Sequence, residues 1–279
     1  MAVKKKFIDL KEVIRSKNPS LAKLMPGFIL NYIRKTIHED RINEILDKHV
    51  GITGLEFVHS MVHNEFKIKA ELHGFENIPD EGRFIFVANH PWGAMEAVTL
   101  IDFLSVKFPN LRFIVNDLLM SIKNYEPLFL PVNKHGAQGR ENAKILEESF
   151  ASDKQILIFP AGMVSRKVKG KVMDLEWKKN FISKAIQHKR DVIPIFIDGQ
   201  NSKFFYRLAS FRTALGIKAN LEMFYLVDEM MKNSNKSLPY YIGKPISYQT
   251  FDNSKTKDDW AEAVKQHVYQ LKNNENKSF

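Results

Sequence analysis

The chain has 279 residues, of which 44% are hydrophobic and 27% are charged, a composition that belongs to a folded globular protein and excludes a disordered or fibrous one. Lys and Arg total 42 against 32 Asp and Glu, and the net charge of +10 suits nucleic acid, an anionic membrane surface, or a phosphorylated or acyl-carrier substrate, with a solvated basic surface as an equal alternative. No cysteine occurs, which excludes disulfides, thiolate nucleophiles and cysteine-based zinc sites.

The N-terminus lacks the pattern of an export signal. Its start is basic, but Asp9, Lys11, Glu12 and Arg15 interrupt the apolar run that a signal peptide needs. No segment supplies the ~20 consecutive apolar residues of a spanning helix. We therefore expect a cytoplasmic protein that is peripheral on the inner face of the cytoplasmic membrane.

Residues 1–66 are predicted to form a helical N-terminal extension. Pro19 and Ser20 are a helix start signal, and Pro26–Gly27 is expected to break or kink the helix that follows. Apolar residues recur there at helical spacing: Leu21, Leu24, Phe28, Ile29, Tyr32 and Ile33. Because residues 20–36 also include several cations, this segment is predicted either to bind an anionic membrane or to pack on the rest of the protein.

Residues 67–279 are predicted to form an α/β domain. Short β-rich runs occur at 67–73, 83–88, 112–115, 128–132, 155–160, 191–197, 220–226 and 240–246. Helical patterns lie between them at 96–106, 138–151, 177–188 and 202–215. Several runs are continuously apolar, as expected of central strands covered by helices on both faces. The sequence predicts a mostly parallel or mixed central sheet covered by helices.

The C-terminal segment is predicted to be a closing amphipathic helix. Thr256 and Asp259 have the spacing of a capping box. One face of the helix carries the apolar residues Trp260, Val264, Val268 and Leu271.

The first candidate site is VANHPWGAME, where Asn89 and His90 follow an apolar strand. Glu96 lies six residues after His90, an offset of about 600° on a continuous helix, so the two side chains can meet only across a bend. Pro91 and Gly93 supply that bend. A carboxylate that orients a histidine lets the other ring nitrogen act as a general base. A hydrogen-bonded structural histidine is the alternative.

The second candidate site is FPAGMVSRK, residues 159–167, after another apolar strand. Gly162 permits close approach of the backbone to a ligand, while Ser165 and Arg166 add a donor and a positive charge suited to a phosphate or carboxylate. An ordinary turn with surface cations is an equal alternative. A third cluster lies in residues 128–140, where Lys134 is the candidate for anion binding and a solvated loop is the alternative.

Four segments in this order carry a resemblance to a known family: NHPWGAME, FLPVNK, FPAGMVSR and VIPIFIDGQNS. The chain from about residue 67 to 246 resembles the PlsC-like lysophospholipid (1-acylglycerol-3-phosphate) acyltransferase superfamily. The branch it is most similar to is the haemolysin-like one, related to ornithine- and glycine-lipid O-acyltransferases. Two departures are present: Glu96 stands where an aspartate is usual, and FPAG lacks the glutamate of the FPEG block.

The resemblance implies transfer of a fatty acyl group from a thioester, on acyl carrier protein or coenzyme A, to the hydroxyl of a lysolipid. The acceptor is either lysophosphatidic acid or a monoacylated amino-acid lipid. It implies His90 and Glu96 as catalytic residues and Asn89, Lys134, Gly162, Ser165 and Arg166 as substrate-binding residues. No metal, cofactor or acyl-enzyme is implied.

Four further residues match the same branch and are predicted to be structural. Asp174 and Asn201–Ser202 are expected to act as polar caps of the helices that follow them, and Trp177 as a packed aromatic anchor.

Other functions lack their sequence patterns. No G-x-S-x-G elbow occurs for a serine hydrolase, and no glycine-rich nucleotide motif occurs. His59 and His63 have helical i, i+4 spacing, but no third metal ligand is evident, so surface or core histidines are expected. The remaining rival is a non-catalytic basic protein that binds anionic lipid or membrane surfaces; nucleic acid is not expected, because the cations are dispersed.

Overall fold

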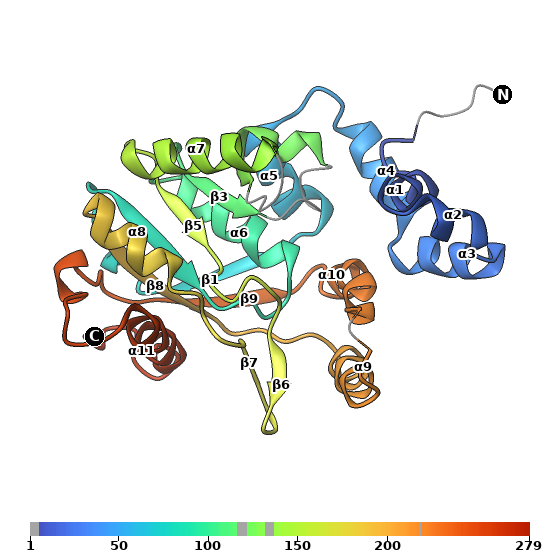
Figure 1. The fold of residues 1–279 in the computed structure, drawn as a ribbon. Helices are drawn as coiled ribbons and strands as arrows, with labels where there is room; N and C mark the ends of the chain where they lie inside the picture. Colours follow the sequence, from blue (N-terminus) through green and yellow to red (C-terminus); the bar gives the residue numbers. More distant parts are fainter. Residues whose placement is uncertain (1–5, 116–121, 132–136, 218) are drawn as a thin grey trace. The chain divides into compact units, whose positions relative to one another are not determined.

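The computed structural model describes residues 6–115, 122–131, 137–217 and 219–279, and its contacts divide the chain into two compact units (Figure 1). The helical unit combines Met1–Ile52 with Ser202–Ser234, and the sheet unit combines Thr53–Asn201 with Asn235–Phe279. This division differs from the predicted boundary at residue 66. Residues 53–66 cluster with the sheet, and a segment far along the chain joins the N-terminal helices.

The described part of the helical unit consists of short helices: α1 (Leu10–Lys17), α2 (Pro19–Leu24), α3 (Gly27–Thr36), α4 (Glu39–Lys48), α9 (Lys203–Ala214), the 3-10 helix η5 (Leu221–Tyr225) and α10 (Leu226–Lys232). The predicted break at Pro26–Gly27 is confirmed, because α2 ends at Leu24 and α3 begins at Gly27. The buried Glu39 carboxylate joins three of these helices. It accepts hydrogen bonds from Leu10 N at 3.0 Å and Arg34 Nε at 3.1 Å.

The predicted strand over residues 220–226 is wrong, because this segment forms η5 and the start of α10. The carboxylate of Glu222 is fully buried there and accepts from Arg212 Nε at 2.8 Å. His38 Nε2 lies 2.9 Å from Asp228 Oδ1, which joins α10 to the N-terminal helices. These long-range contacts override the local alternation of apolar and polar residues.

In the sheet unit, seven of the described strands form one sheet, in the order β1-β9-β8-β2-β5-β3-β4. All neighbours are parallel except β8 and β9, which confirms the predicted mostly parallel, mixed sheet. The strands are β1 (Lys69–His73), β2 (Phe84–Ala88), β3 (Arg112–Val115), β4 (Phe129–Pro131), β5 (Ile156–Ile158), β8 (Asp191–Ile197) and β9 (Ser237–Ile242).

The remaining described helices of this unit are α5 (Gly54–Ser60), the π-helical turn η1 (Met61–Glu65), η2 (Phe75–Asn77), α6 (Ala94–Ser105), η4 (Lys123–Leu128), α7 (Ala137–Ala151), α8 (Asn180–His188), η6 (Tyr248–Thr250) and α11 (Lys257–Gln270). No helix in the described ranges is both long enough and apolar enough to cross a membrane.

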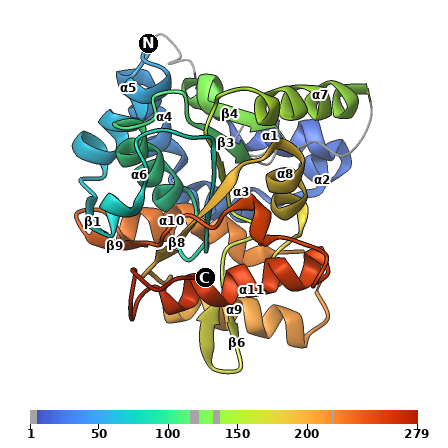
Figure 2. The same cartoon turned by 90° about the vertical axis from the view of Figure 1, so that its left-hand side faces the viewer.

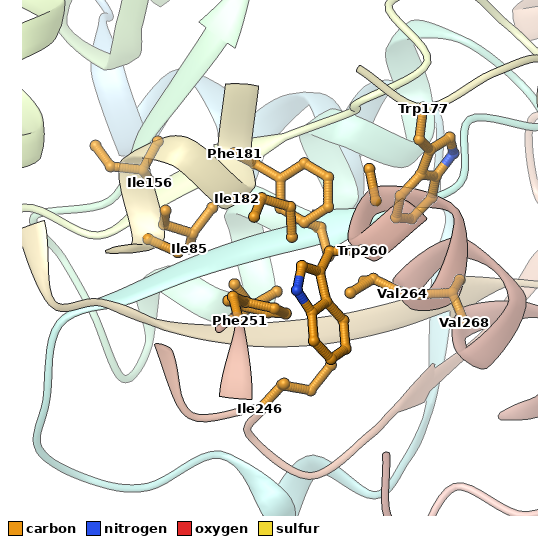
Figure 3. Close-up of a cluster of buried hydrophobic side chains, with 14 of the residues drawn as sticks. Ile85, Ile156, Trp177, Phe181, Ile182, Ile246, Phe251, Trp260, Val264 and Val268 are labelled. Atoms are coloured by element: carbon orange, nitrogen blue, oxygen red, sulfur yellow. The ribbon is translucent and has the colours of Figure 1, made fainter. Parts of the chain in front are cut away.

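Helices cover both faces of the sheet. In β2, Ile85 and Val87 belong to a hydrophobic cluster with α8 and α11, which Figure 3 shows in close-up. Phe84 and Phe86 alternate with them, and both rings contact Phe108, just beyond the end of α6. The central strands, such as β2 and β8, are therefore buried on both faces, as their apolar runs predict.

The closing helix is confirmed as α11. The side chain of Thr256 accepts from Asp259 N at 3.1 Å, and the reciprocal contact of the capping box is present. The predicted apolar face is buried in the same hydrophobic cluster, which contains Trp260, Val264, Val268 and Leu271; Figure 3 labels the first three.

A small hairpin was not expected from the sequence. Strands β6 (Arg166–Val168) and β7 (Lys171–Met173) pair antiparallel, and Figures 1 and 2 both show the hairpin projecting away from the sheet. Lys169 and Gly170 form its turn with positive φ angles of 48° and 85°. Because each strand has three residues, the pattern was too short to be recognised.

Candidate active site

The candidate catalytic residues lie at the carboxyl ends of two neighbouring parallel strands. His90 follows β2, and the FPAG segment follows β5, which pairs in parallel with β2. Parallel neighbours end at the same edge of a sheet, where α/β proteins bind ligands. Segments about seventy positions apart in the sequence are thereby brought together.

His90 and Glu96 meet across the predicted bend. Nδ1 of His90 is hydrogen-bonded to Oε1 of Glu96, which lies in the first turn of α6. The other carboxylate oxygen accepts from Trp92 N, inside the bend, at 2.5 Å. Gly93 has a φ of 115°, a backbone conformation that other residues rarely adopt, and α6 begins at the next residue. The longer glutamate side chain therefore reaches the histidine.

The Glu96 carboxyl group is completely buried, whereas the His90 side chain is 18% exposed. Burial raises the pKa of Glu96 above its ordinary value, while His90 and the amides of Trp92 and Gly93 oppose that shift. Glu96 therefore depends on His90 and these amides to carry its charge. A positive charge formed on His90 would have this carboxylate as its immediate partner.

Phe159 fixes the plane of the His90 ring. The two rings stack with centroids 4.2 Å apart and an angle of 14° between their planes. Because Nδ1 faces Glu96 and can donate its proton there, Nε2 holds the lone pair of the neutral ring. The arrangement suits a general base.

His90 also lines an apolar cavity of about 560 Å³. Its walls come from β3, β5, α7 and α8 and include Phe113, Val115, Leu146, Phe150, Ile158 and Phe181. This volume lies in the range of small-molecule binding sites. A hydrocarbon chain is the ligand that such walls favour, because apolar surface gains by leaving water.

Asp174 organises the loop that carries His90. One carboxylate oxygen accepts from His90 N at 3.1 Å and from Ser165 Oγ at 2.5 Å, and the other accepts from Trp177 Nε1 at 2.8 Å. The predicted role of Asp174 as a helix cap is wrong, since α8 begins only at Asn180. The predicted anchor role of Trp177 is confirmed by its 1% exposure.

We expect Asp174→Asn to lower the free energy of unfolding by about 1–3 kcal/mol. Three donors point at this carboxylate, so an amide group must oppose one of them with its own N–H. The midpoint of thermal unfolding measures the effect. Asp198→Asn is the matched control, because that carboxylate is partly exposed and pairs with Lys272. Equal midpoints for the two variants would contradict the organising role.

The predicted substrate-binding residues Asn89 and Ser165 are held by protein partners. The Asn89 side chain bridges to β8, accepting from Ile197 N at 2.7 Å and donating to Ile197 O at 2.9 Å. Ser165 N donates to His90 O at 2.7 Å, and its hydroxyl donates to Asp174. Both residues therefore position the loop around His90, and contact with substrate stays a prediction.

Gly162 lines the cavity beside His90, with a φ of 66°. Its N–H donates to Phe159 O at 3.0 Å and thereby closes a turn, and its predicted contact with substrate stays a prediction. Arg166 is 8% exposed and its Nη1 donates to Val164 O at 2.6 Å. Its predicted contact with an anionic headgroup stays a prediction, and Lys134 lies outside the described residues.

Two residues near the site were not predicted to be part of it. Lys178 lines the same cavity as His90, and its ammonium group lies 3.0 Å from where a side chain on Gly162 would begin. Asn201, predicted to be a cap, donates to Pro91 O at 3.1 Å within the bend. The cap of α9 is Ser202, as predicted, because its side chain accepts from Phe205 N.

The sequence profile of the family described as "Acyltransferase" matches residues 12–278, so this chain belongs to that family and is an acyltransferase. A relative in Bacteroides thetaiotaomicron named lyso-glycine lipid O-acyltransferase is 45% identical over 95% of this chain and 97% of its own length. A relative of the same name in Phocaeicola vulgatus is 43% identical over 95% of each. Membership of an acyltransferase family argues against the alternative of a non-catalytic basic protein that binds anionic lipid.

The fold is also that of a solved acyltransferase. The crystal structure of the 1-acyl-sn-glycerophosphate (LPA) acyltransferase PlsC from Thermotoga maritima matches with a TM-score of 0.50 and 19% identity. The match covers 96% of this chain and 98% of that one. The similarity therefore extends over both units of the chain.

Proposed function

We propose that this protein transfers a fatty acyl group from a thioester to the hydroxyl of a monoacylated glycine lipid. The observation that carries the proposal is the His90–Glu96 pair beside an apolar cavity. The names of the two curated relatives support the acceptor. The donor is an acyl thioester of acyl carrier protein or coenzyme A, with no further cofactor.

In the proposed reaction, Nε2 of His90 removes the proton of the acceptor hydroxyl as its oxygen attacks the thioester carbonyl. A carbon–oxygen bond forms, the carbon–sulfur bond breaks, and the proton passes from His90 to the departing sulfur. The Glu96 carboxylate stabilises the imidazolium that exists between these two proton transfers. The chemistry requires neither a metal nor an acyl-enzyme.

The acceptor choice is tested by competition. Purified protein is given one acyl thioester and an equimolar mixture of a monoacylated glycine lipid and lysophosphatidic acid, and the products are quantified by mass spectrometry. We expect the diacylated glycine lipid to dominate among the products. The Lys178 ammonium group is proposed to bind the carboxylate of the monoacylated glycine lipid, so Lys178→Met is expected to raise the KM of that acceptor. Predominant phosphatidic acid would contradict the proposed acceptor while leaving acyl transfer intact.

The apolar cavity beside His90 is proposed to bind the acyl chain of the thioester donor. Leu146→Trp fills part of it, and we expect the rate with long-chain thioesters to fall at least about tenfold more than the rate with short-chain ones, since each buried methylene contributes about 0.8 kcal/mol. Ile145→Trp is the matched control, because Ile145 is the neighbouring residue of α7 and does not line the cavity. An unchanged chain-length profile in Leu146→Trp would contradict this assignment.

We further propose that the helical unit binds an anionic membrane surface. Leu24 and Phe28 are 80% and 76% exposed, and the described residues of α3 include none that is buried. Residues 20–36 also carry the cations Lys23 and Lys35, whereas Arg34 in the same segment is paired with Glu39. Exposed apolar side chains beside cations are typical of helices that lie in the membrane interface.

The membrane proposal is tested by flotation with lipid vesicles. The double variant Leu24→Asp, Phe28→Asp is expected to lose most binding to vesicles that contain anionic lipid, because it removes apolar area and adds negative charge. Val106→Asp is the control, since Val106 is an exposed apolar residue of the sheet unit. Equal flotation of the wild type and both variants would contradict a membrane contact through Leu24 and Phe28.

A further inference from the structure

A cluster of two histidines and one aspartate lies in the sheet unit, apart from the catalytic dyad proposed above, His90 and Glu96. His59 is on α5, His63 is on the π-helical turn η1 that continues it, and Asp102 is on α6. These helices pack side by side (Figure 1). The sequence showed the two histidines at i, i+4 spacing but could not show that Asp102, some forty residues later, faces both of them.

The side chains converge through their ligand atoms. Nδ1 of His59 lies 3.1 Å from Oδ1 of Asp102, and Nε2 of His63 lies 2.7 Å from Oδ2. The centroids of the two imidazole rings are 4.2 Å apart. One nitrogen from each ring and a carboxylate oxygen all lie within 4.8 Å of one another.

The local backbone serves this convergence. The turn η1 is π-helical, with Phe66 N bonded to Met61 O at 3.0 Å, an i to i+5 contact. Such turns are rare and occur frequently at functional sites. Asp102 is 16% exposed, while His59 and His63 are 68% and 48% exposed, so an ion could enter from solvent and the imidazoles can turn to meet it.

The structure assigns a binding site for a divalent transition-metal ion of the Zn²⁺ class to His59, His63 and Asp102. Two imidazole nitrogens with one carboxylate oxygen suit Zn²⁺, Co²⁺ or Ni²⁺ rather than Mg²⁺, which prefers oxygen ligands alone. Three protein ligands leave the fourth tetrahedral position to water. A bound ion would replace the two hydrogen bonds and tie α5 and η1 to α6, the helix whose first turn carries Glu96.

The binding test uses the purified full chain after removal of any affinity tag and dialysis against a chelator. Titration calorimetry with Zn²⁺ is expected to show one equivalent bound to the wild type. His63→Ala and Asp102→Ala are expected to bind at least about tenfold more weakly, because each removes a ligand. His73→Ala is the matched control, since His73 is an exposed histidine of the same unit. The control is expected to bind as the wild type does.

A second measurement detects Zn²⁺ binding through thermal unfolding instead of calorimetry. The thermal unfolding midpoint of the wild type is expected to rise with Zn²⁺, because a ligand that binds only the folded state stabilises it. The rise should vanish in His63→Ala and Asp102→Ala. Absence of Zn²⁺ binding by the wild type, or equal binding and equal midpoint shifts in all proteins, would overturn the site and leave a hydrogen-bonded surface cluster. Neither measurement involves acyl transfer.

Discussion

The His90→Ala variant is expected to lose about 10³-fold or more of kcat while keeping its fold. His90 is the side chain that both contacts the buried Glu96 carboxylate and lines the apolar cavity, so its removal takes away the proposed proton acceptor. General base catalysis contributes about 10²–10⁴-fold. The rate is measured from free thiol released by the acyl thioester in the presence of acceptor.

Two controls accompany this variant. Far-UV circular dichroism and the thermal midpoint establish that the protein is folded, and His73→Ala establishes that loss of a distant histidine is harmless. A partial recovery of rate on adding free imidazole would support the role, because the substitution leaves a space against Phe159. A rate within about threefold of the wild type, by contrast, would exclude His90 as the general base.

For Glu96→Gln we expect a fall in kcat of about 10³-fold with a smaller change in KM. The carboxylate accepts from His90 on one oxygen and from Trp92 N on the other. Glutamine has a single oxygen for these two donors. If that oxygen faces Trp92, the NH₂ group faces Nδ1 of His90, and the ring must carry its proton on Nε2. A ring in that tautomer cannot accept a proton from the hydroxyl.

Glu96→Asp is the informative comparison. Aspartate keeps both oxygens and the negative charge, so we expect it to retain far more activity than Glu96→Gln despite its shorter reach. Comparing Glu96→Gln with Glu96→Asp separates the effect of the negative charge from the effect of the carboxylate's position. Deletion of the side chain would remove both at once. If Glu96→Gln turns over like the wild type, another group must orient His90.

The dyad and its bend could be predicted because all their determinants lie within eight residues. Pro91 and Gly93 are local signals for a bend, and a histidine after an apolar strand has a defined place in a parallel sheet. The central strands and α11 could also be predicted from local sequence. Burial on two faces gives a strand a continuous apolar run, and Thr256 marks the start of α11.

Apart from the short β6–β7 hairpin, the features that were missed depend on contacts between separate elements of the chain. Asp174 meets His90 across eighty-four positions, and nothing in its own surroundings distinguishes it from a helix cap. The charge partner of Glu222 is Arg212, and without that contact residues 220–226 have the pattern of a strand. Asp102 gives no sign in the sequence of the two histidines it faces.

In the proposed mechanism, the acyl group passes directly from a thioester to a lipid hydroxyl at His90. The most direct test of this transfer is a single-turnover reaction of excess wild-type protein with acyl thioester and monoacylated glycine lipid, in which free thiol and new ester are both quantified by mass spectrometry, beside His90→Ala. Direct transfer predicts that thiol and diacylated lipid appear together in a one-to-one ratio, with no acylated protein, and that neither appears with His90→Ala. Thiol release without the ester, or an acylated protein that precedes it, would contradict direct transfer at His90.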